Sequence, residues 1–347
     1  MKRAYVVDAA RTAVGKFGGT LSTVRPDDLG ADVIKALVAR NSSIDLNEIE
    51  DVVFGAANQA GEDNRNVARM SLLMAGLPVT VPGLTINRLC ASSLQAIADV
   101  SKNIAIGYGD MFIAGGVESM TRAPFVLPKA ESAYSRAGQV YDTSIGWRFI
   151  NPKLSALYHP YTMGETAENI AEKYGITRQE QDEFAYKTQL NYQNALNANK
   201  FENEIIPVHI PQRKGDALVF QQDEHPRLST VDQLSKLSAA FKSGGTVTAG
   251  NASGINDGAA ALLIVSEEAL KRYNLEPIAE VVSSAAAGVP PEIMGIGPVP
   301  ATQKALKRAG IGVKDLDLVE LNEAFAAQAI ACMRDLDLNP DIVNVNG

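Results

Sequence analysis

The chain passes from a β-rich run into a helical pattern at Leu84-Thr85-Ile86-Asn87-Arg88-Leu89-Cys90-Ala91-Ser92-Ser93-Leu94-Gln95-Ala96-Ile97. Apolar residues recur at helical spacing after the cysteine, so we expect a helix that begins around residues 90–92 and runs to Gly107. The first turn of a helix offers unpaired N–H groups and the positive end of the dipole, which favour a thiolate. Cys90 is therefore a candidate nucleophile. The alternative is a small apolar core residue.

The composition excludes several classes of protein. Of the 347 residues, 46% are hydrophobic and 21% are charged, as in an ordinary globular protein. A net charge of −8 argues against nucleic acid or an anionic membrane as the main partner. Cys90 and Cys332 are the two cysteines, which gives no disulfide framework and fits a reducing compartment. No signal peptide or membrane-spanning run is present, so we expect a cytoplasmic protein. Separately, we predict no metal site.

Strands alternating with helices predict an α/β layered fold with a largely parallel sheet. The expected strands are residues 4–7, 49–55, 84–86, 111–116, 261–265, 279–282 and 316–321. Helices are expected at residues 29–38, 266–273 and 301–309, and residues 164–200 are strongly helical in character. A glycine-rich turn at residues 15–19 lacks the G-x-G-x-x-G spacing, so a dinucleotide site is set aside.

The character of the chain changes after residue 120. Residues 121–244 hold all three histidines and the single tryptophan, and are expected to form a domain inserted into the α/β core. Residues 1–120 together with 245–273 then form one half, and residues 274–347 form a second. A faint repeat of helix, acidic turn and strand, with the second copy at 301–321, indicates a duplicated core.

Four motifs in this order together resemble the thiolase family. They are N-R-L-C-A-S-S (87–93), G-G-V-E-S-M-T-R-A-P (115–124), T-A-G-N-A-S-G-I-N-D-G (248–258) and N-E-A-F-A (322–326). Residues 59–69, 134–136 and 142–152 are similar to the branch that acts on 3-oxoadipyl-CoA. Neighbouring branches, which act on acetoacetyl-CoA or medium- and long-chain 3-ketoacyl-CoA, share most of these positions and remain alternatives.

The resemblance implies a duplicated five-layer α-β-α-β-α core with an inserted loop domain, residues 121–244, over the active site. Cys90 would attack a 3-oxoacyl-CoA, release acetyl-CoA and carry the acyl group until CoA collects it. Asn322 would hold a water in an oxyanion hole, and the Cys90 N–H would serve another. Coenzyme A is thus a co-substrate, with no permanently bound cofactor. The family usually forms homodimers or homotetramers.

The family's CoA contacts fall on seven residues: Met163, Arg227 and Phe241 in the loop domain, and Ala249, Ser253, Ala324 and Phe325 in the core. Four of the candidates have a plainer reading. Asn322 could cap the helix that follows it, Phe325 and Met163 could be core residues, and Arg227 could be a solvated surface residue. The family commonly has histidine where Thr162 stands here, so the CoA contact that the family makes at this position is not carried over to Thr162.

The family pattern continues with a G-H-P motif, whose histidine activates the cysteine, and a C-x-G motif, whose cysteine moves protons. Neither occurs in these 347 residues, and Cys332 is expected to pack in a core. We therefore expect an incomplete second half, a truncated sequence, and little or no thiolase activity. Two further readings are a condensing enzyme of the ketoacyl-synthase type, against which the long loop region and N-E-A-F-A argue, and a catalytically inactive CoA-binding or scaffold protein.

Overall fold

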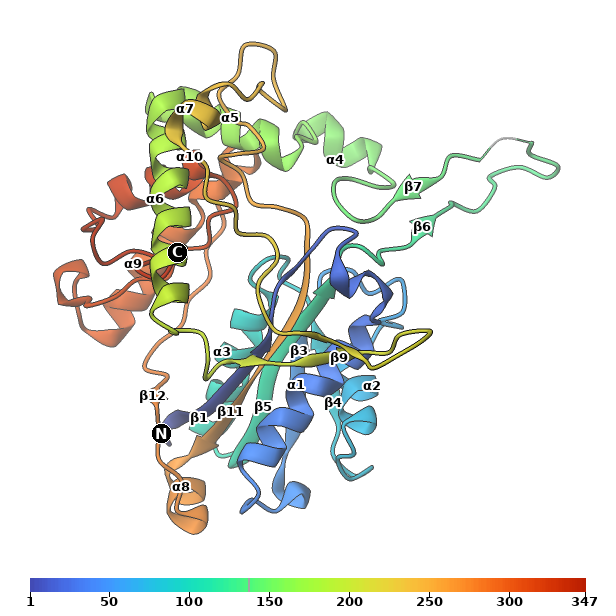
Figure 1. The fold of residues 1–347 in the computed structure, drawn as a ribbon, viewed down its shortest axis with the longest axis vertical. Coiled ribbons are helices and arrows are strands. Elements are labelled where there is room, and N and C mark those ends of the chain that lie inside the picture. Colours follow the sequence, from blue (N-terminus) through green and yellow to red (C-terminus); the bar gives the residue numbers. More distant parts are fainter. Residues whose placement is uncertain (137) are drawn as a thin grey trace. The chain divides into compact units, whose positions relative to one another are not determined.

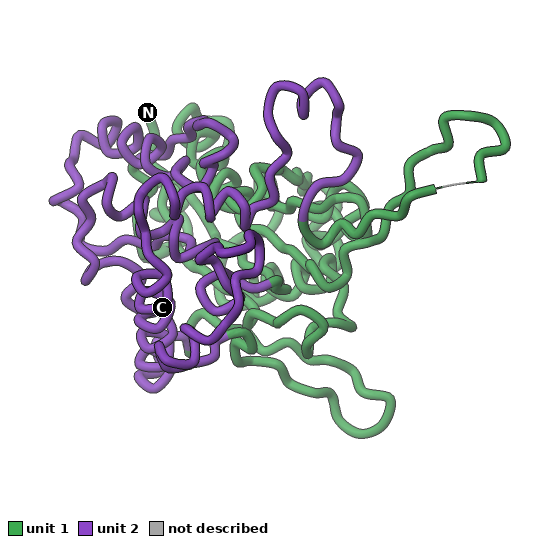
Figure 2. The backbone as a smooth tube through the Cα atoms, turned by 90° about the horizontal axis from the view of Figure 1, so that it is seen from above, with its two compact units in different colours: residues 1–145, 202–225, 255–282 green, residues 146–201, 226–254, 283–347 purple. Residues whose placement is uncertain are grey.

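The computed structural model describes residues 1–136 and 138–347 (Figure 1). The chain forms two compact units (Figure 2). Unit 1 comprises residues 1–145, 202–225 and 255–282, and unit 2 comprises residues 146–201, 226–254 and 283–347. Both units include parts of residues 121–244, so the division into two halves and a loop domain stays a prediction.

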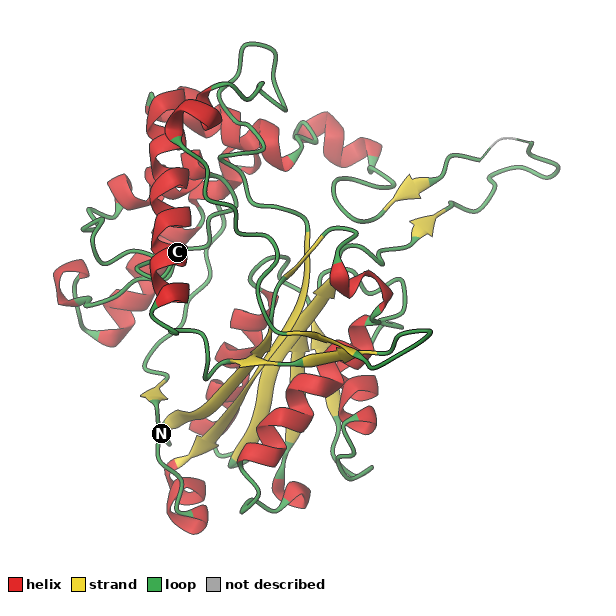
Figure 3. Cartoon of the chain, viewed as in Figure 1, coloured by secondary structure: helices red, strands yellow, loops and turns green. Residues whose placement is uncertain are grey.

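A mixed sheet forms the centre of unit 1 (Figure 3). Its main path has the order β12-β1-β11-β5-β3-β4, with β2 paired to β11 and β8 paired to β1. The strands are β1 (Ala4–Thr12), β2 (Gly15–Lys16), β3 (Asp51–Gly55), β4 (Gly83–Ile86), β5 (Met111–Ser119), β8 (Ile205–Ile206), β11 (Asn256–Ser266) and β12 (Ala279–Glu280).

The expectation of a largely parallel sheet was wrong. β3 is parallel to both β4 and β5, whereas β11 lies antiparallel to both of its long neighbours, β1 and β5. β12 is also antiparallel to β1. An apolar run such as residues 261–265 marks a buried strand, but its pattern is the same in either direction. The chain returns to the sheet at β11 after a long excursion, and only the fold sets the direction of that return.

Helices cover both faces of this sheet. They are α1 (Pro26–Arg40), α2 (Val67–Met74), α3 (Ser92–Ala105) and α8 (Glu267–Tyr273). Successive side chains of a strand point to opposite faces. Accordingly, Val52 and Phe54 join the apolar cluster that contains α1, whereas Val53 joins the one that contains Val100 and Ile104 of α3. Apolar clusters therefore lie on both faces of the sheet, and unit 1 has three layers, α-β-α. Each fully buried aliphatic side chain in these clusters contributes about 1.5–3 kcal/mol to stability.

Residues 202–225 are tied to the first strand of unit 1. Arg11 donates from Nη1 and Nη2 to the two oxygens of Asp223 (2.7 and 3.1 Å) and from Nε to Glu204 (2.7 Å). Two short antiparallel pairs complete the unit. They are β6 (Phe125–Val126) with β7 (Tyr141–Asp142), and β9 (Val208–Ile210) with β10 (Leu218–Phe220).

Unit 2 is mainly helical in the described residues. Its helices are α4 (Pro152–Leu157), α5 (Met163–Tyr174), α6 (Arg178–Asn197), α7 (Val231–Ser235), α9 (Pro298–Ala309) and α10 (Ala326–Asp335). α5, α6 and α7 each begin with a threonine N-cap in a capping box, which satisfies backbone N–H groups at the helix start. α10 buries Ala331 against Ile170 of α5 and also buries Cys332, as expected from the sequence.

The predicted repeat is present in part. In unit 1, α1 leads through a 3-10 turn (Leu46–Glu48) to β3, which pairs in parallel with β4. In unit 2, α9 leads through a 3-10 turn (Val313–Asp315) to Val319, which forms an isolated parallel bridge with Val343. The expected strand at residues 316–321 was therefore wrong, because a single bridge does not make a ladder. No helix in the described parts of the chain has both the length and the apolarity to cross a membrane.

Candidate active site

Cys90 lies exposed in the turn between β4 and α3. Helix α3 begins at Ser92, with Ala91 as its N-cap, so the start of the helix falls within the predicted range and Cys90 directly precedes the cap. The Ser92 hydroxyl accepts from the Arg88 N–H (2.8 Å) and donates to the Leu89 carbonyl (2.6 Å). These two bonds close the turn under the cysteine. The plainer reading, a buried apolar cysteine, is excluded by its exposure.

The residue before the cysteine holds an unusual backbone conformation. Leu89 has φ +49°, in the left-handed region, which costs roughly 1–2 kcal/mol for a residue with a side chain. Asn87 stabilises this turn, because its Oδ1 accepts from the Leu89 N–H (2.8 Å) and its Nδ2 donates to the Ala57 carbonyl (2.9 Å). Such strain persists where the surroundings fix it, often at functional sites. The sequence does not predict this conformation, because leucine disfavours the left-handed region.

Two glycines let the start of α3 lie against the sheet. A Cβ on Gly55, the last residue of β3, would lie 2.4 Å from the Ser92 carbonyl carbon and the Ser93 nitrogen. A Cβ on Gly116 of β5 would lie 2.1 Å from the Ser93 hydroxyl. Real Cβ contacts are essentially never this short, so both positions need glycine. The sequence showed these glycines only as strand boundaries, and their role in placing Cys90 was missed.

The loop after β3 contains a buried carboxylate. Asp63 is 6% exposed, and among the described residues its Oδ1 has no hydrogen-bond partner. Burial raises the pKa of Asp63 to about 6, and the nearby Glu118 and Asp27 carboxylates add to this effect. Glu118 in turn accepts from the Ala57 N–H (2.7 Å). The loop that supports Asn87 therefore carries a carboxyl group whose pKa lies at about 6.

Asn322, in unit 2, does not cap the following helix, so that reading was wrong. Helix α10 begins at Ala326, its N-cap is Phe325, and no side chain bonds to the cap. Asn322 is exposed, and in the described parts of the chain its side-chain amide makes no hydrogen bond. An unengaged amide on a fixed backbone is able to hold a water.

The residues on either side of Asn322 are anchored. Leu321 exchanges two hydrogen bonds of 2.8 Å with the side chain of Asn344. The Glu323 carboxylate accepts from the Thr188 hydroxyl (2.9 Å) and from the Asn344 amide (2.5 Å). Burial raises the pKa of Glu323, although these two donors act in the opposite direction. Thr188 and Asn344 were missed by the sequence reading.

Most of the predicted CoA residues lie together in unit 2. Met163, Ala324 and Phe325 belong to one apolar cluster with Ala167 and Val247. The Ser253 N–H donates to the Ala324 carbonyl (3.0 Å), next to a bridge between Ala252 and Phe325. Ala249 and Ser253 are exposed. Phe325 is itself buried, in agreement with its plainer reading as a core residue.

Phe241 lies across Phe325. Their rings meet edge to face, with centroids 6.0 Å apart, and Phe241 stays 41% exposed. A Cβ on Gly164, the second residue of α5, would lie 2.1–2.4 Å from ring atoms of Phe241, so this packing requires glycine there. Thr162, where the family commonly has histidine, serves as the N-cap of α5 and so fixes the helix that begins with Met163.

Arg227 takes no part in these contacts among the described residues. Its backbone N–H donates to Gln189 of α6 (2.8 Å), and the residue is exposed. Within the described residues no carboxylate pairs with its guanidinium, so it is a cation available to an anion. The structure thus groups six of the seven predicted CoA residues through contacts or the 249–253 segment, and leaves Arg227 as a separate prediction.

The described residues contain no group of three or more His, Cys, Asp or Glu side chains able to hold a metal.

Comparison with known proteins identifies the family. The family model "Thiolase, N-terminal domain" matches residues 4–268 of this chain. The family model "Thiolase, C-terminal domain" matches residues 275–347. The chain belongs to the thiolase family and is an acyltransferase by class. It is similar to a "Beta-ketoadipyl-CoA thiolase" of Acinetobacter baylyi, with 55% identity over all of this chain and 86% of that protein.

Solved structures confirm the thiolase fold predicted from the motifs. A crystal structure of the Bacillus anthracis acetyl-CoA acetyltransferase has a TM-score of 0.93 and 41% identity, and covers 100% of this chain and 86% of that one. A crystal structure of human mitochondrial 3-ketoacyl-CoA thiolase in complex with CoA has a TM-score of 0.90 and 38% identity, over 100% of this chain and 85% of that one.

Proposed function

We propose that the residues of this chain serve the thiolytic cleavage of 3-oxoadipyl-CoA by CoA. The observation that carries the proposal is an exposed cysteine on a strained turn at a helix start, in a chain 55% identical to a β-ketoadipyl-CoA thiolase. Cys90 is the nucleophile of this proposal, Asn322 holds the water of one oxyanion hole, and the Cys90 N–H contributes to the other.

The reaction has two acyl transfers. The Cys90 thiolate adds to the C3 carbonyl of 3-oxoadipyl-CoA, and the resulting oxyanion collapses as the C2–C3 bond breaks. The electron pair leaves on C2, which takes up a proton to give acetyl-CoA, and a succinyl thioester remains on the Cys90 sulfur. The CoA thiol then adds to this thioester while its proton is removed. The C–S bond to Cys90 breaks, which gives succinyl-CoA and regenerates the thiolate.

The CoA molecule is proposed to use Met163, Phe241, Ala249, Ser253, Ala324 and Phe325, with Arg227 for an anionic group of the nucleotide end. Support comes from the contacts among Met163, Phe241, Ser253, Ala324 and Phe325, and from the place of Ala249 in the same segment as Ser253. The Arg227 guanidinium, which has no carboxylate partner among the described residues, supports its assignment to the nucleotide end. A thiolase of similar fold is known with CoA bound. The homodimeric or homotetrameric state and the cytoplasmic location remain predictions.

Two other functions stay open. The similarity to an acetyl-CoA acetyltransferase and to a 3-ketoacyl-CoA thiolase supports acetoacetyl-CoA or a longer 3-ketoacyl-CoA as the substrate. The Cys90 turn and the predicted CoA residues are equally compatible with a catalytically inactive CoA-binding protein, because neither feature by itself requires turnover.

The test measures CoA-dependent loss of 3-oxoadipyl-CoA and of acetoacetyl-CoA by chromatography, with Cys90→Ser as the control. Succinyl-CoA formation by the unmodified chain, above the Cys90→Ser level and faster than acetoacetyl-CoA cleavage, supports the proposal. Faster cleavage of acetoacetyl-CoA would instead support acetoacetyl-CoA as the substrate. CoA binding with no product above the control, even over long incubation, favours the inactive CoA-binding protein. Repeated turnover would refute the separate prediction of little or no activity.

A further inference from the structure

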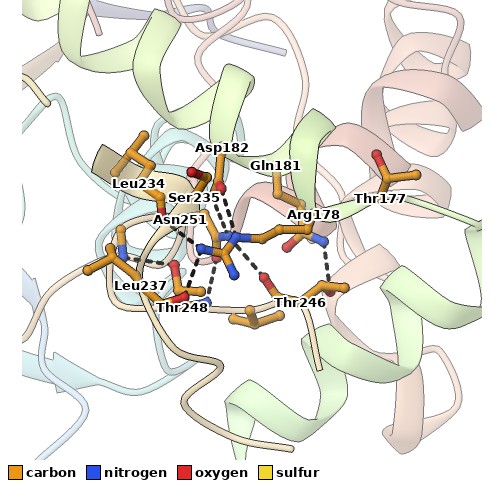
Figure 4. A network of polar contacts seen from close by, with 12 residues as sticks. Thr177, Arg178, Gln181, Asp182, Leu234, Ser235, Leu237, Thr246, Thr248 and Asn251 are labelled. Carbon is orange, nitrogen blue, oxygen red and sulfur yellow. Dashed lines mark hydrogen bonds and ion pairs between the residues drawn. The ribbon is translucent and has the colours of Figure 1, made fainter. Parts of the chain in front are cut away.

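Two buried carboxylates, Asp182 and Glu168, hold the segment that carries Ala249 and Ser253. The first, Asp182 of α6, is 1% exposed and accepts hydrogen bonds from the Asn251 amide (3.0 Å) and from Nε of Arg178 (2.7 Å). Arg178 also donates to the carbonyls of Leu234 (2.6 Å) and Leu237 (2.9 Å), as Figure 4 shows. The arginine neutralises the buried Asp182 and links it to α7.

Asn251 uses its side chain to close the turn in front of it. Its Oδ1 accepts from the Thr248 N–H (2.8 Å), and its Nδ2 donates to the Thr246 carbonyl (3.1 Å) as well as to Asp182. Its backbone carbonyl accepts from the Ala326 N–H (2.9 Å). One buried side chain thus fixes the turn that presents Ala249, and its backbone joins that turn to the 324–326 segment.

Glu168 of α5 holds the beginning of the same segment. It is 4% exposed and accepts from the N–H groups of Thr246 (2.9 Å) and Val247 (2.8 Å). A Cβ on Gly245 would lie 2.2 Å from the Glu168 carboxylate, so that carboxylate can approach only a glycine. At the other end, a Cβ on Gly250 would lie 2.6 Å from Leu237. The segment is therefore fixed at both ends by groups that do not themselves contact CoA in the proposed function.

A buried polar network of this kind is a costly way to gain stability, because apolar residues of equal volume often stabilise as well or better. Its distinctive effect is to fix one backbone arrangement, since each donor and acceptor accepts few geometries. Here the arrangement sets where Ala249, Ser253 and Ala324 lie relative to one another. We propose that Asp182 and Asn251 are positioning residues for CoA binding, with Glu168 in the same role. This inference rests on the proposed function, in which Ala249, Ser253 and Ala324 contact CoA.

The test is the CoA dissociation constant of Asn251→Ala, measured by calorimetry on the full chain. A misplacement of about 1 Å can cost a catalysed reaction about a hundredfold in rate, and for binding we expect a smaller effect, a rise of the dissociation constant of about tenfold. The amides of residues 246–251 should exchange hydrogen faster. The alkylation rate of Cys90, which lies in the other unit, should stay unchanged, whereas a general loss of structure would alter it as well.

Asn169→Ala is the matched control. Asn169 of α5 also donates its amide to a backbone carbonyl, that of Glu292 (3.0 Å), away from residues 244–253. This variant should bind CoA like the unmodified chain. If Asn251→Ala does not fold, Glu168→Gln decides, because it keeps the shape and turns one acceptor into a donor that faces N–H groups. It should weaken CoA binding in the same direction.

Three results would overturn the inference, and they separate its failure from a failure of the proposed function. Unchanged CoA affinity in a folded Asn251→Ala, or in Glu168→Gln if only that variant folds, overturns it and leaves the proposed function standing, as does an equal loss in Asn169→Ala. No CoA binding by the unmodified chain overturns the proposed function and this inference with it.

Discussion

Replacing Gly55 by alanine should displace the start of helix α3 and with it the turn that carries Cys90. The new Cβ would lie 2.4 Å from the Ser92 carbonyl carbon and the Ser93 nitrogen, and 2.6 Å from the Ser92 Cβ. All three atoms belong to the backbone or lie next to it, so no flexible side-chain end can swing aside. Reaching an ordinary contact distance requires a shift of about 1 Å.

The expected cost follows from that shift. Overpacking of this size costs about 1–3 kcal/mol, and a domain of this size loses about 2–4 °C in melting temperature per kcal/mol. The Ser92 hydroxyl would also move from the Arg88 N–H and the Leu89 carbonyl, the two bonds that close the Cys90 turn. We expect a lower melting temperature together with an altered rate of Cys90 alkylation.

The control is Gly258→Ala, in β11 of the same unit. A Cβ there would meet only the Thr12 hydroxyl, at an ordinary 3.5 Å, so both readouts should match the unmodified chain. A Gly55→Ala protein with the original melting temperature and the original Cys90 alkylation rate would refute the reasoning. It would mean that α3 is not held at the distance the structure shows.

Three further predictions concern single side chains. Because the folded pKa of Asp63 is about 6 and its unfolded value is about 3.9, the folded chain binds more protons in this range, so stability falls as pH rises from about 4 to about 6. Asp63→Asn should therefore melt higher than the unmodified chain at pH 7 and equally near pH 4; no difference at pH 7 would contradict the pKa. Burial raises the pKa of Cys332 to about 11, so at pH 8 only about one thiol in a thousand is ionised. Intact mass should show one alkylation in the native protein and two in urea, and rapid native alkylation of Cys332 would be the contrary result. Gly164→Ala should push the Phe241 ring off Phe325 and weaken CoA binding several-fold with little loss of stability, since that ring is exposed enough to move. Unchanged CoA affinity would remove Phe241 from the proposed contacts.

The sequence predicted the local elements well where periodicity decides them. The helix around Leu29 and Ile34 and the strand at Val52–Phe54 follow from apolar spacing, and the structure shows both. The direction of β11 could not be predicted, because an apolar run has the same pattern whether the strand is parallel or antiparallel to its neighbours. The strand expected at residues 316–321 reduces to one bridge at Val319, because strand propensity matters only where a partner continues the ladder.

For the site, the motifs led to Cys90 and Asn322 but not to the residues that hold them. Leu89 adopts a left-handed backbone that its side chain disfavours, and Gly55 needs to lack a side chain because of a helix distant in sequence. Asn251 was visible only as a letter within a motif, although its amide makes three hydrogen bonds. These roles depend on contacts between segments far apart in the chain, which spacing alone does not encode.

The central claim is that Cys90 carries the acyl group, and peptide mapping after incubation with 3-oxoadipyl-CoA tests it most directly. The chain is quenched in acid, digested, and searched for a succinyl thioester that hydroxylamine removes. We predict the adduct on the peptide that contains Cys90, none on the peptide that contains Cys332, and none in Cys90→Ser. An adduct on Cys332, or no adduct on Cys90 in a chain that binds CoA, would contradict the claim.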